Sequence, residues 1–135
     1  MKQLLALLVF ALAACGQGPT LKIADAQYRP PLGATGVGVG YFSITSQTSD
    51  RIVGVSSPQA EKVEIHDAIT NNGQSSMKRL ETVSLPAGET VTFAPRGMHL
   101  MIFAPKPVAA GATFPIQIQL ESGRSETIEF HPALM

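Results

Sequence analysis

Short apolar stretches separated by turn-forming residues run through most of this chain, and they constrain its fold more than any other feature. After residue 20, no segment repeats its apolar side chains with the 3.6-residue period of a helix. The clearest stretch, Phe114 to Leu120, alternates instead, which is typical of a strand with one buried face. Turn signals such as Asn71-Asn72-Gly73 recur between the stretches. We therefore predict an all-β domain.

The length of 135 residues suits one domain, and 12 glycines and 10 prolines supply frequent turns. Eight or nine short strands of this kind favour an antiparallel β-sandwich of Greek-key type, with an open barrel as the second choice. The expected strands cover residues 21–26, 37–45, 51–55, 63–66, 77–83, 91–93, 98–103, 114–120 and 127–130.

The N-terminus has the pattern of an export signal. Lys2 gives a positive start, and Leu4 to Ala14 is an apolar stretch of eleven residues. That stretch is too short to cross a bilayer as a helix, which needs about 20 residues, but it fits the core of a secretory signal. It ends in Leu12-Ala13-Ala14-Cys15, which resembles a bacterial lipobox whose cysteine becomes the lipid-bearing N-terminus. A simple signal peptide with an incidental cysteine is the alternative.

These observations divide the chain into three predicted parts. We expect residues 1–14 to be a lipoprotein signal peptide, residues 15–20 a tether and residues 21–135 the folded domain. The protein would be exported to the periplasm and held at a membrane by lipid on Cys15. Gly16, rather than an aspartate, after that cysteine favours the outer membrane.

The charge balance and the single cysteine narrow the possible partners and cofactors. Ten basic and ten acidic residues give no net charge, which argues against nucleic acid as a partner because that needs a basic face. Cys15 is the only cysteine, so a folded domain that begins at residue 21 has no thiol. It can form no internal disulfide, and it cannot build a blue-copper site, which requires a thiolate.

Two histidines and two methionines follow a fixed spacing: His66, ten residues, Met77, twenty-one residues, His99, one residue, Met101. Thioethers are soft ligands and imidazole is a borderline one, so the set favours Cu(I) over zinc, magnesium or calcium. His99 and Met101 are two apart on an expected strand and would share a face. His66 and Met77 flank the Asn71-Asn72-Gly73 turn, so a hairpin would bring them together.

Taken singly, each of these residues has an ordinary structural interpretation. A methionine in a β-domain is usually core filler, and a histidine near a strand end is usually solvated. The set is more informative, because the chain has only five methionines and three histidines and four of these eight fall into the spacing.

The spacing resembles the motif of the PCu(A)C periplasmic copper chaperones, and all four positions match. The flanking segments 29–31, 40–45, 63–66, 85–88 and 97–101 are also similar, so the resemblance covers about residues 21 to 130. It implies a cupredoxin-like antiparallel Greek-key β-sandwich that binds one Cu(I) through His66, Met77, His99 and Met101. Many members carry a further methionine two residues after the first histidine, where this chain has Ala68.

The resemblance also implies a function and partners. A copper chaperone of this family would pass Cu(I) to the copper A centre of cytochrome c oxidase subunit II, alongside Sco-type proteins. The chain would not be an enzyme, because no serine, carboxylate or histidine stands in a recognisable catalytic arrangement. Asp67, beside His66, could orient that ring or simply be solvated. The alternative function is a lipid-anchored structural or adhesive β-sandwich module without a metal.

Overall fold

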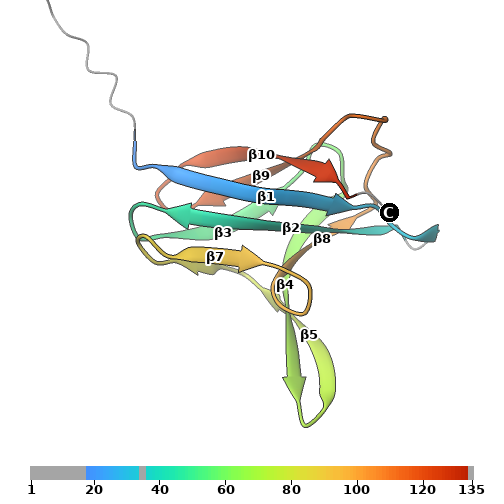
Figure 1. Cartoon of the computed structure of the whole chain (residues 1–135), viewed down its shortest axis with the longest axis horizontal. Helices are drawn as coiled ribbons and strands as arrows, with labels where there is room; N and C mark the ends of the chain where they lie inside the picture. The colour runs from blue at the N-terminus through green and yellow to red at the C-terminus, as the bar shows by residue number, and fades with distance from the viewer. Residues whose placement is uncertain (1–17, 34–35, 134–135) are drawn as a thin grey trace, which may run out of the picture.

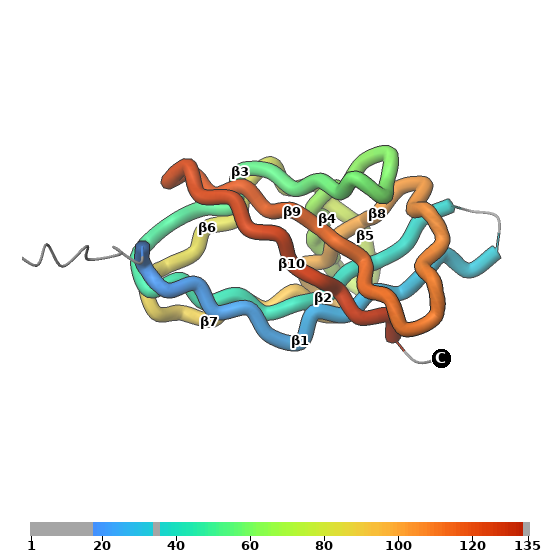
Figure 2. Tube along the Cα trace, turned by 90° about the horizontal axis from the view of Figure 1, so that it is seen from above, coloured from blue at the N-terminus to red at the C-terminus, as the bar shows by residue number. Residues whose placement is uncertain are grey.

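The computed structural model describes residues 18–33 and 36–133, and these fold as two facing layers of β-strands (Figures 1 and 2). The predicted signal peptide and Cys15 lie outside the described residues. Within the described ranges there are ten strands and no α-helix, and no helix that could span a membrane. The strands are β1 (Leu21–Arg29), β2 (Val37–Ser46), β3 (Asp50–Ser56), β4 (Lys62–Asn71), β5 (Gln74–Leu80), β6 (Val83–Leu85), β7 (Thr90–Phe93), β8 (His99–Phe103), β9 (Phe114–Leu120) and β10 (Ser125–Pro132). The predicted all-β class is confirmed.

The first layer has the strand order β5-β4-β8-β2-β1, with β7 also paired to β2, and the second has the order β10-β9-β3-β6. In Figure 2, β3 and β9 lie along one side of the molecule and β7 and β2 along the other. Parallel pairing of β1 with β10 joins the layers at one edge, and every other strand pair in the described chain is antiparallel. The mainly antiparallel expectation therefore holds except at this edge.

The core lies between the layers and follows the alternation read from the sequence. All four predicted inward residues of β9, Phe114, Ile116, Ile118 and Leu120, are buried. Phe42 stacks on Phe93 with ring centroids 4.5 Å apart and meets Phe130 of the other layer edge-on at 5.6 Å. Aromatic pairs at such separations contribute an attraction in addition to the burial of their apolar surface. These rings therefore help to hold β2, β7 and β10 together.

Glycine at position 38 is required by close packing between β2 and β1. A Cβ atom there would lie 2.8 Å from a ring carbon of Tyr28 and 3.0 Å from the carbonyl oxygen of Arg29. Gly38 thus shows the close approach of neighbouring backbone that a glycine within a strand often marks.

The β4–β5 hairpin extends beyond the body of the sandwich (Figure 1). Its turn is the one predicted from Asn71-Asn72-Gly73: Asn71 pairs with Gln74, and Asn72 and Gly73 take the positive φ angles of 50° and 76°. Two central residues with positive φ are what an Asn-Gly hairpin turn demands. The turn sets the register in which Met77 lies opposite Ala68.

Candidate functional site

The four predicted ligands lie on one face of the first layer, on three neighbouring strands. His66 of β4 is directly opposite His99 of β8, and Met101 follows His99 by two residues on the same face. Met77 of β5 faces Ala68, which is two residues after His66. Because side chains alternate along a strand, all four project to the same side of the sheet.

That side is the outer face, away from the core between the layers. Val63 and Ile65 alternate with His66 along β4 and are buried in the core, and Leu100 does the same beside His99 on β8. The site is therefore built on a sheet whose other face is packed. Strands that are packed on their other face hold such side chains in fixed positions below an accessible surface.

A hollow of about 500 Å³ opens on this face, and Met77, His99 and Met101 all line it. His66 stands beside His99, with their ring centroids 6.1 Å apart. A metal ion about 2 Å from one nitrogen of each ring requires centroids no more than roughly 6.4 Å apart, and the observed separation lies within that limit. Ala68, which replaces the additional methionine of the related motif, also faces the hollow.

His66 has one ring nitrogen engaged and the other free of any partner. Its Nε2 lies 2.9 Å from Oε2 of Glu64, and its Nδ1 is buried with no hydrogen-bond partner. A carboxylate only accepts, so Nε2 carries the hydrogen and Nδ1 presents a lone pair. The hydrogen bond from His66, followed by one from Lys62, holds the pKa of Glu64 below its usual range.

His99 shows the same arrangement with the nitrogens exchanged. Its Nδ1 donates to the carbonyl oxygen of Gly97 at 2.9 Å, and its Nε2 is buried without a partner. Nδ1 of His66 and Nε2 of His99 are the buried, unpaired side-chain polar atoms found in the described part of the chain. Such atoms are rare and need an explanation, and coordination of a metal ion by both nitrogens would supply one.

The loop between β7 and β8 brings the Gly97 carbonyl into position. Its oxygen also accepts from the backbone N–H of Ala68 at 3.3 Å, which docks the loop on β4. Arg96 at the tip has a φ of 69° and its side chain lines the hollow. The positive φ marks a conformation that is costly for a residue with a Cβ.

The four predicted ligands differ in exposure. Met77 is 64% exposed and His99 only 6%, while His66 and Met101 are intermediate. The group of four side chains thus has one buried end and one open end. Within the described ranges, no three His, Cys, Asp or Glu residues gather in a way that could hold a metal ion.

Sequence reasoning missed Glu64, and it considered Asp67 as the residue beside His66 instead. Asp67 follows His66 directly and therefore projects to the opposite face of β4; in the strand register it lies across from Lys78. Glu64 is two residues before His66 and shares its face. The spacing of two on a strand that was already predicted is the signal that could have identified it.

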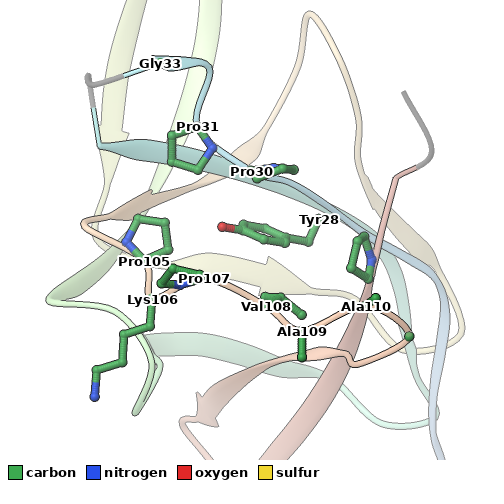
Figure 3. A pocket seen from close by; sticks show the side chains of 12 residues that line it. Tyr28, Pro30, Pro31, Gly33, Pro105, Lys106, Pro107, Val108, Ala109 and Ala110 are labelled. Carbon is green, nitrogen blue, oxygen red and sulfur yellow. The ribbon is translucent and has the colours of Figure 1, made fainter.

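A second hollow lies at the end of β1 and is apolar. Its lining includes Tyr28, Pro30, Pro31, Pro105 and Pro107, and Lys106 extends away from the tyrosine ring (Figure 3). Tyr28 stacks on Phe114 at 4.5 Å, and burial raises the pKa of its phenol. No imidazole, thioether or carboxylate lines this hollow. The soft donor atoms therefore belong to the hollow on the outer face.

A family model described as "Putative lipoprotein LpqE-like" matches residues 21–131. The chain belongs to this LpqE-like family. A curated relative, "Putative lipoprotein Lxx21020" of Leifsonia xyli subsp. xyli (strain CTCB07), is 29% identical over 79 residues, which are 57% of this chain. The chain matches about half, 48%, of that relative's length.

Solved structures show what this LpqE-like protein is similar to in fold. The copper-bound PCuAC domain from PmoF2 has a TM-score of 0.69 at 23% identity, covering 85% of this chain and 93% of that one. The apo PCuAC domain from PmoF1 has a TM-score of 0.68 at 20% identity, covering 85% and 94%. Apo-DR1885 from Deinococcus radiodurans has a TM-score of 0.62 at 18% identity, covering 100% and 95%. The predicted cupredoxin-like β-sandwich is thereby confirmed.

Proposed function

We propose that this LpqE-like protein is a copper chaperone that binds one Cu(I) through His66, Met77, His99 and Met101 and passes it to an acceptor protein. The two buried, unpaired imidazole nitrogens carry the proposal. Each belongs to a ring whose other nitrogen is held by an acceptor, so each lone pair is available without a change of tautomer. Two thioethers beside them complete a soft donor set that selects Cu(I).

The difference in exposure supports transfer rather than storage. His99 is buried and would hold the ion at the closed end, whereas Met77, which is 64% exposed, is within reach of an incoming ligand. A thioether is a weak ligand, and replacing it first leaves the imidazoles in place. The proposed cargo keeps its oxidation state throughout, because only ligands are exchanged.

The proposed setting follows from the N-terminal motif and from the family of lipoproteins to which the chain belongs. Lipid on Cys15 would hold the domain at the outer membrane, facing the periplasm. The proposed acceptor is the copper A centre of cytochrome c oxidase subunit II. A Sco-type protein would act alongside the chaperone in this delivery, as the related motif implies. The protein itself would catalyse no reaction.

A Cu(I) titration under anaerobic conditions tests the proposal. The native protein should bind one equivalent of Cu(I), as measured by competition with a chromophoric chelator. Met77→Leu combined with Met101→Leu removes both sulfur atoms and nearly conserves volume, so the fold should persist while Cu(I) affinity falls by roughly a hundredfold or more. Unchanged affinity would exclude thioether ligation, and no binding by the native protein would leave a tethered structural module.

Replacing Glu64 by glutamine tests how the His66 ring is held. An amide can donate as well as accept, so it no longer requires the hydrogen of His66 to be on Nε2. It also removes a negative charge beside the proposed cation. Cu(I) affinity should fall by about 10- to 100-fold, as is usual when an outer partner of a ligand is lost. Asp67→Asn, on the opposite face, is the matched control and should leave the affinity within about twofold.

A further inference from the structure

Cations surround the proposed copper site, although the chain as a whole has no net charge. We name this group of side chains, all exposed, the basic rim: Arg29, Lys62, Arg79 and Arg96. Arg96 lines the hollow itself, and the guanidinium of Arg29 lies 5.5 Å from the ring centre of Tyr41, which is another lining residue. The strand register puts Arg79 directly opposite His66 and Lys62 on the same face of β4 as Glu64.

Few anions offset the basic rim. The carboxylate of Glu64 is already shared, since it accepts from His66 and lies 3.1 Å from the Lys62 ammonium and 3.8 Å from Nε of Arg79. Glu81, just beyond the end of β5, lies 3.5 Å from Arg79. Four cations therefore face two anions around the hollow.

The second layer and its turns have the opposite balance. Asp50, Glu121, Glu126 and Glu129 occur there. Arg51 and Arg124 are the basic residues in the same segments, and both are engaged with acids of their own layer, Glu121 and Glu126. The basic rim thus gives the surface around the proposed copper site a local excess of positive charge, whereas these segments of the second layer have an excess of negative charge. Such a field orients an oppositely charged partner before contact and raises the rate of encounter.

Arg96 is the member of the basic rim whose position is hardest to explain by the fold alone. Its backbone holds a φ of 69°, where glycine would be free of strain. Within the described residues it has no ion pair, and its side chain nevertheless lines the hollow. A strained position that keeps a free cation beside the proposed ligands is expected if that cation meets a partner.

We infer that the acceptor of this chaperone is a protein that presents an acidic surface around its own copper ligands and docks on the basic rim. This inference rests on the function proposed above and names the kind of partner. An acidic protein fits better than an anionic lipid surface. Cu(I) leaving the hollow needs soft donor atoms on the acceptor, whereas lipid phosphates offer only hard oxygens.

Two synthetic acceptor peptides test the inference directly. Both contain the same Cys-Gly-Gly-Cys core, one flanked by four glutamates and the other by four lysines. Copper transfer is redox-neutral: the two thiols release their protons to the buffer, and the thiolates replace the protein ligands on Cu(I). The rate is followed by stopped flow through the ultraviolet absorbance of the Cu(I)–thiolate product.

At low salt we expect the copper-loaded native protein to transfer at least about tenfold faster to the glutamate peptide than to the lysine peptide. The difference should shrink as salt rises to about 0.5 M, where charges are screened over a few ångströms. Arg29→Glu combined with Arg96→Glu should abolish or reverse the preference. Arg29 does not line the hollow, so Arg29→Glu alone should still bind one Cu(I) and should already lower the preference. Arg96 lines the hollow, so the Cu(I) stoichiometry of the double variant is measured before its transfer rates are compared. Arg51→Glu, a charge reversal on the second layer, is the control and should keep the preference.

The outcomes separate this inference from the proposed function. If the native protein binds no Cu(I), the proposed function fails. If it binds one Cu(I) but transfers equally fast to both peptides, or faster to the lysine peptide, only the acidic partner is excluded. The same exclusion follows if the loaded protein shows no preference between peptides but binds phosphatidylglycerol vesicles in a manner lost in the Arg29→Glu/Arg96→Glu variant.

Discussion

Replacing His99 by leucine is expected to weaken Cu(I) binding by roughly a thousandfold, since even the loss of an outer partner of a ligand costs about 10- to 100-fold. His99 is the most buried of the four proposed ligands at 6% exposure. Its Nε2 is aimed at no protein group, so the native fold gains nothing from that atom unless a metal is bound. A competition titration with a chromophoric Cu(I) chelator measures the loss.

The same substitution should leave the metal-free protein nearly as stable as before. Gly97 loses the hydrogen bond from the ring, but its oxygen still accepts from the N–H of Ala68. Leucine also removes a buried unpaired nitrogen, which favours the variant. We expect the free energy of unfolding to change by less than about 1.5 kcal/mol in a urea titration. His131→Leu, at an exposed site on β10, is the control, and wild-type affinity in the His99 variant would remove that ring from the proposed site.

Phe42→Ala is expected to lower the free energy of unfolding by about 3–5 kcal/mol, the usual cost of truncating a buried phenylalanine. The ring is 1% exposed and contacts aromatic rings of both layers, so the cavity left behind cannot close without moving one layer against the other. Val53→Ala, at a side chain that is 43% exposed, should change stability by less than about 0.5 kcal/mol.

The effect of Phe42→Ala on copper should be small. The proposed ligands lie on the outer face of the first layer, whereas Phe42 fills the space between the layers. At a temperature where the variant is still folded, its Cu(I) affinity should be within a few-fold of native. A large loss of affinity in the folded variant would mean that the core and the site are coupled.

Two parts of the ligand arrangement were predictable, because each depends on local rules. His99 and Met101 share a face through the two-residue period of a strand, and the Asn72-Gly73 turn sets the hairpin register that puts Met77 beside Ala68. The direct pairing of His66 with His99 was not predictable, because the contact of β4 with β8 joins strands that are not neighbours in sequence. The alternation of side chains along a strand predicts the face on which a residue lies, but it does not predict which other strand pairs with that strand.

The parallel β1–β10 edge and the role of the Gly97 carbonyl were also beyond sequence reasoning. Both depend on contacts between distant segments: Gln27 aligns with His131, and the β7–β8 loop docks on Ala68. The first predicted strand was likewise too short, since β1 continues to Arg29 through an irregularity between Ala24 and Gln27. The predicted strand ended at Ala26, whereas pairing with β2 resumes at Gln27.

Copper X-ray absorption on the reduced, copper-loaded protein tests the central claim most directly, because it reports the atoms bound to the metal. The proposed site predicts Cu(I) with two sulfur and two nitrogen neighbours, and loss of the sulfur signal in the Met77→Leu/Met101→Leu variant. A coordination shell of nitrogen and oxygen alone in the native protein would contradict the proposed site.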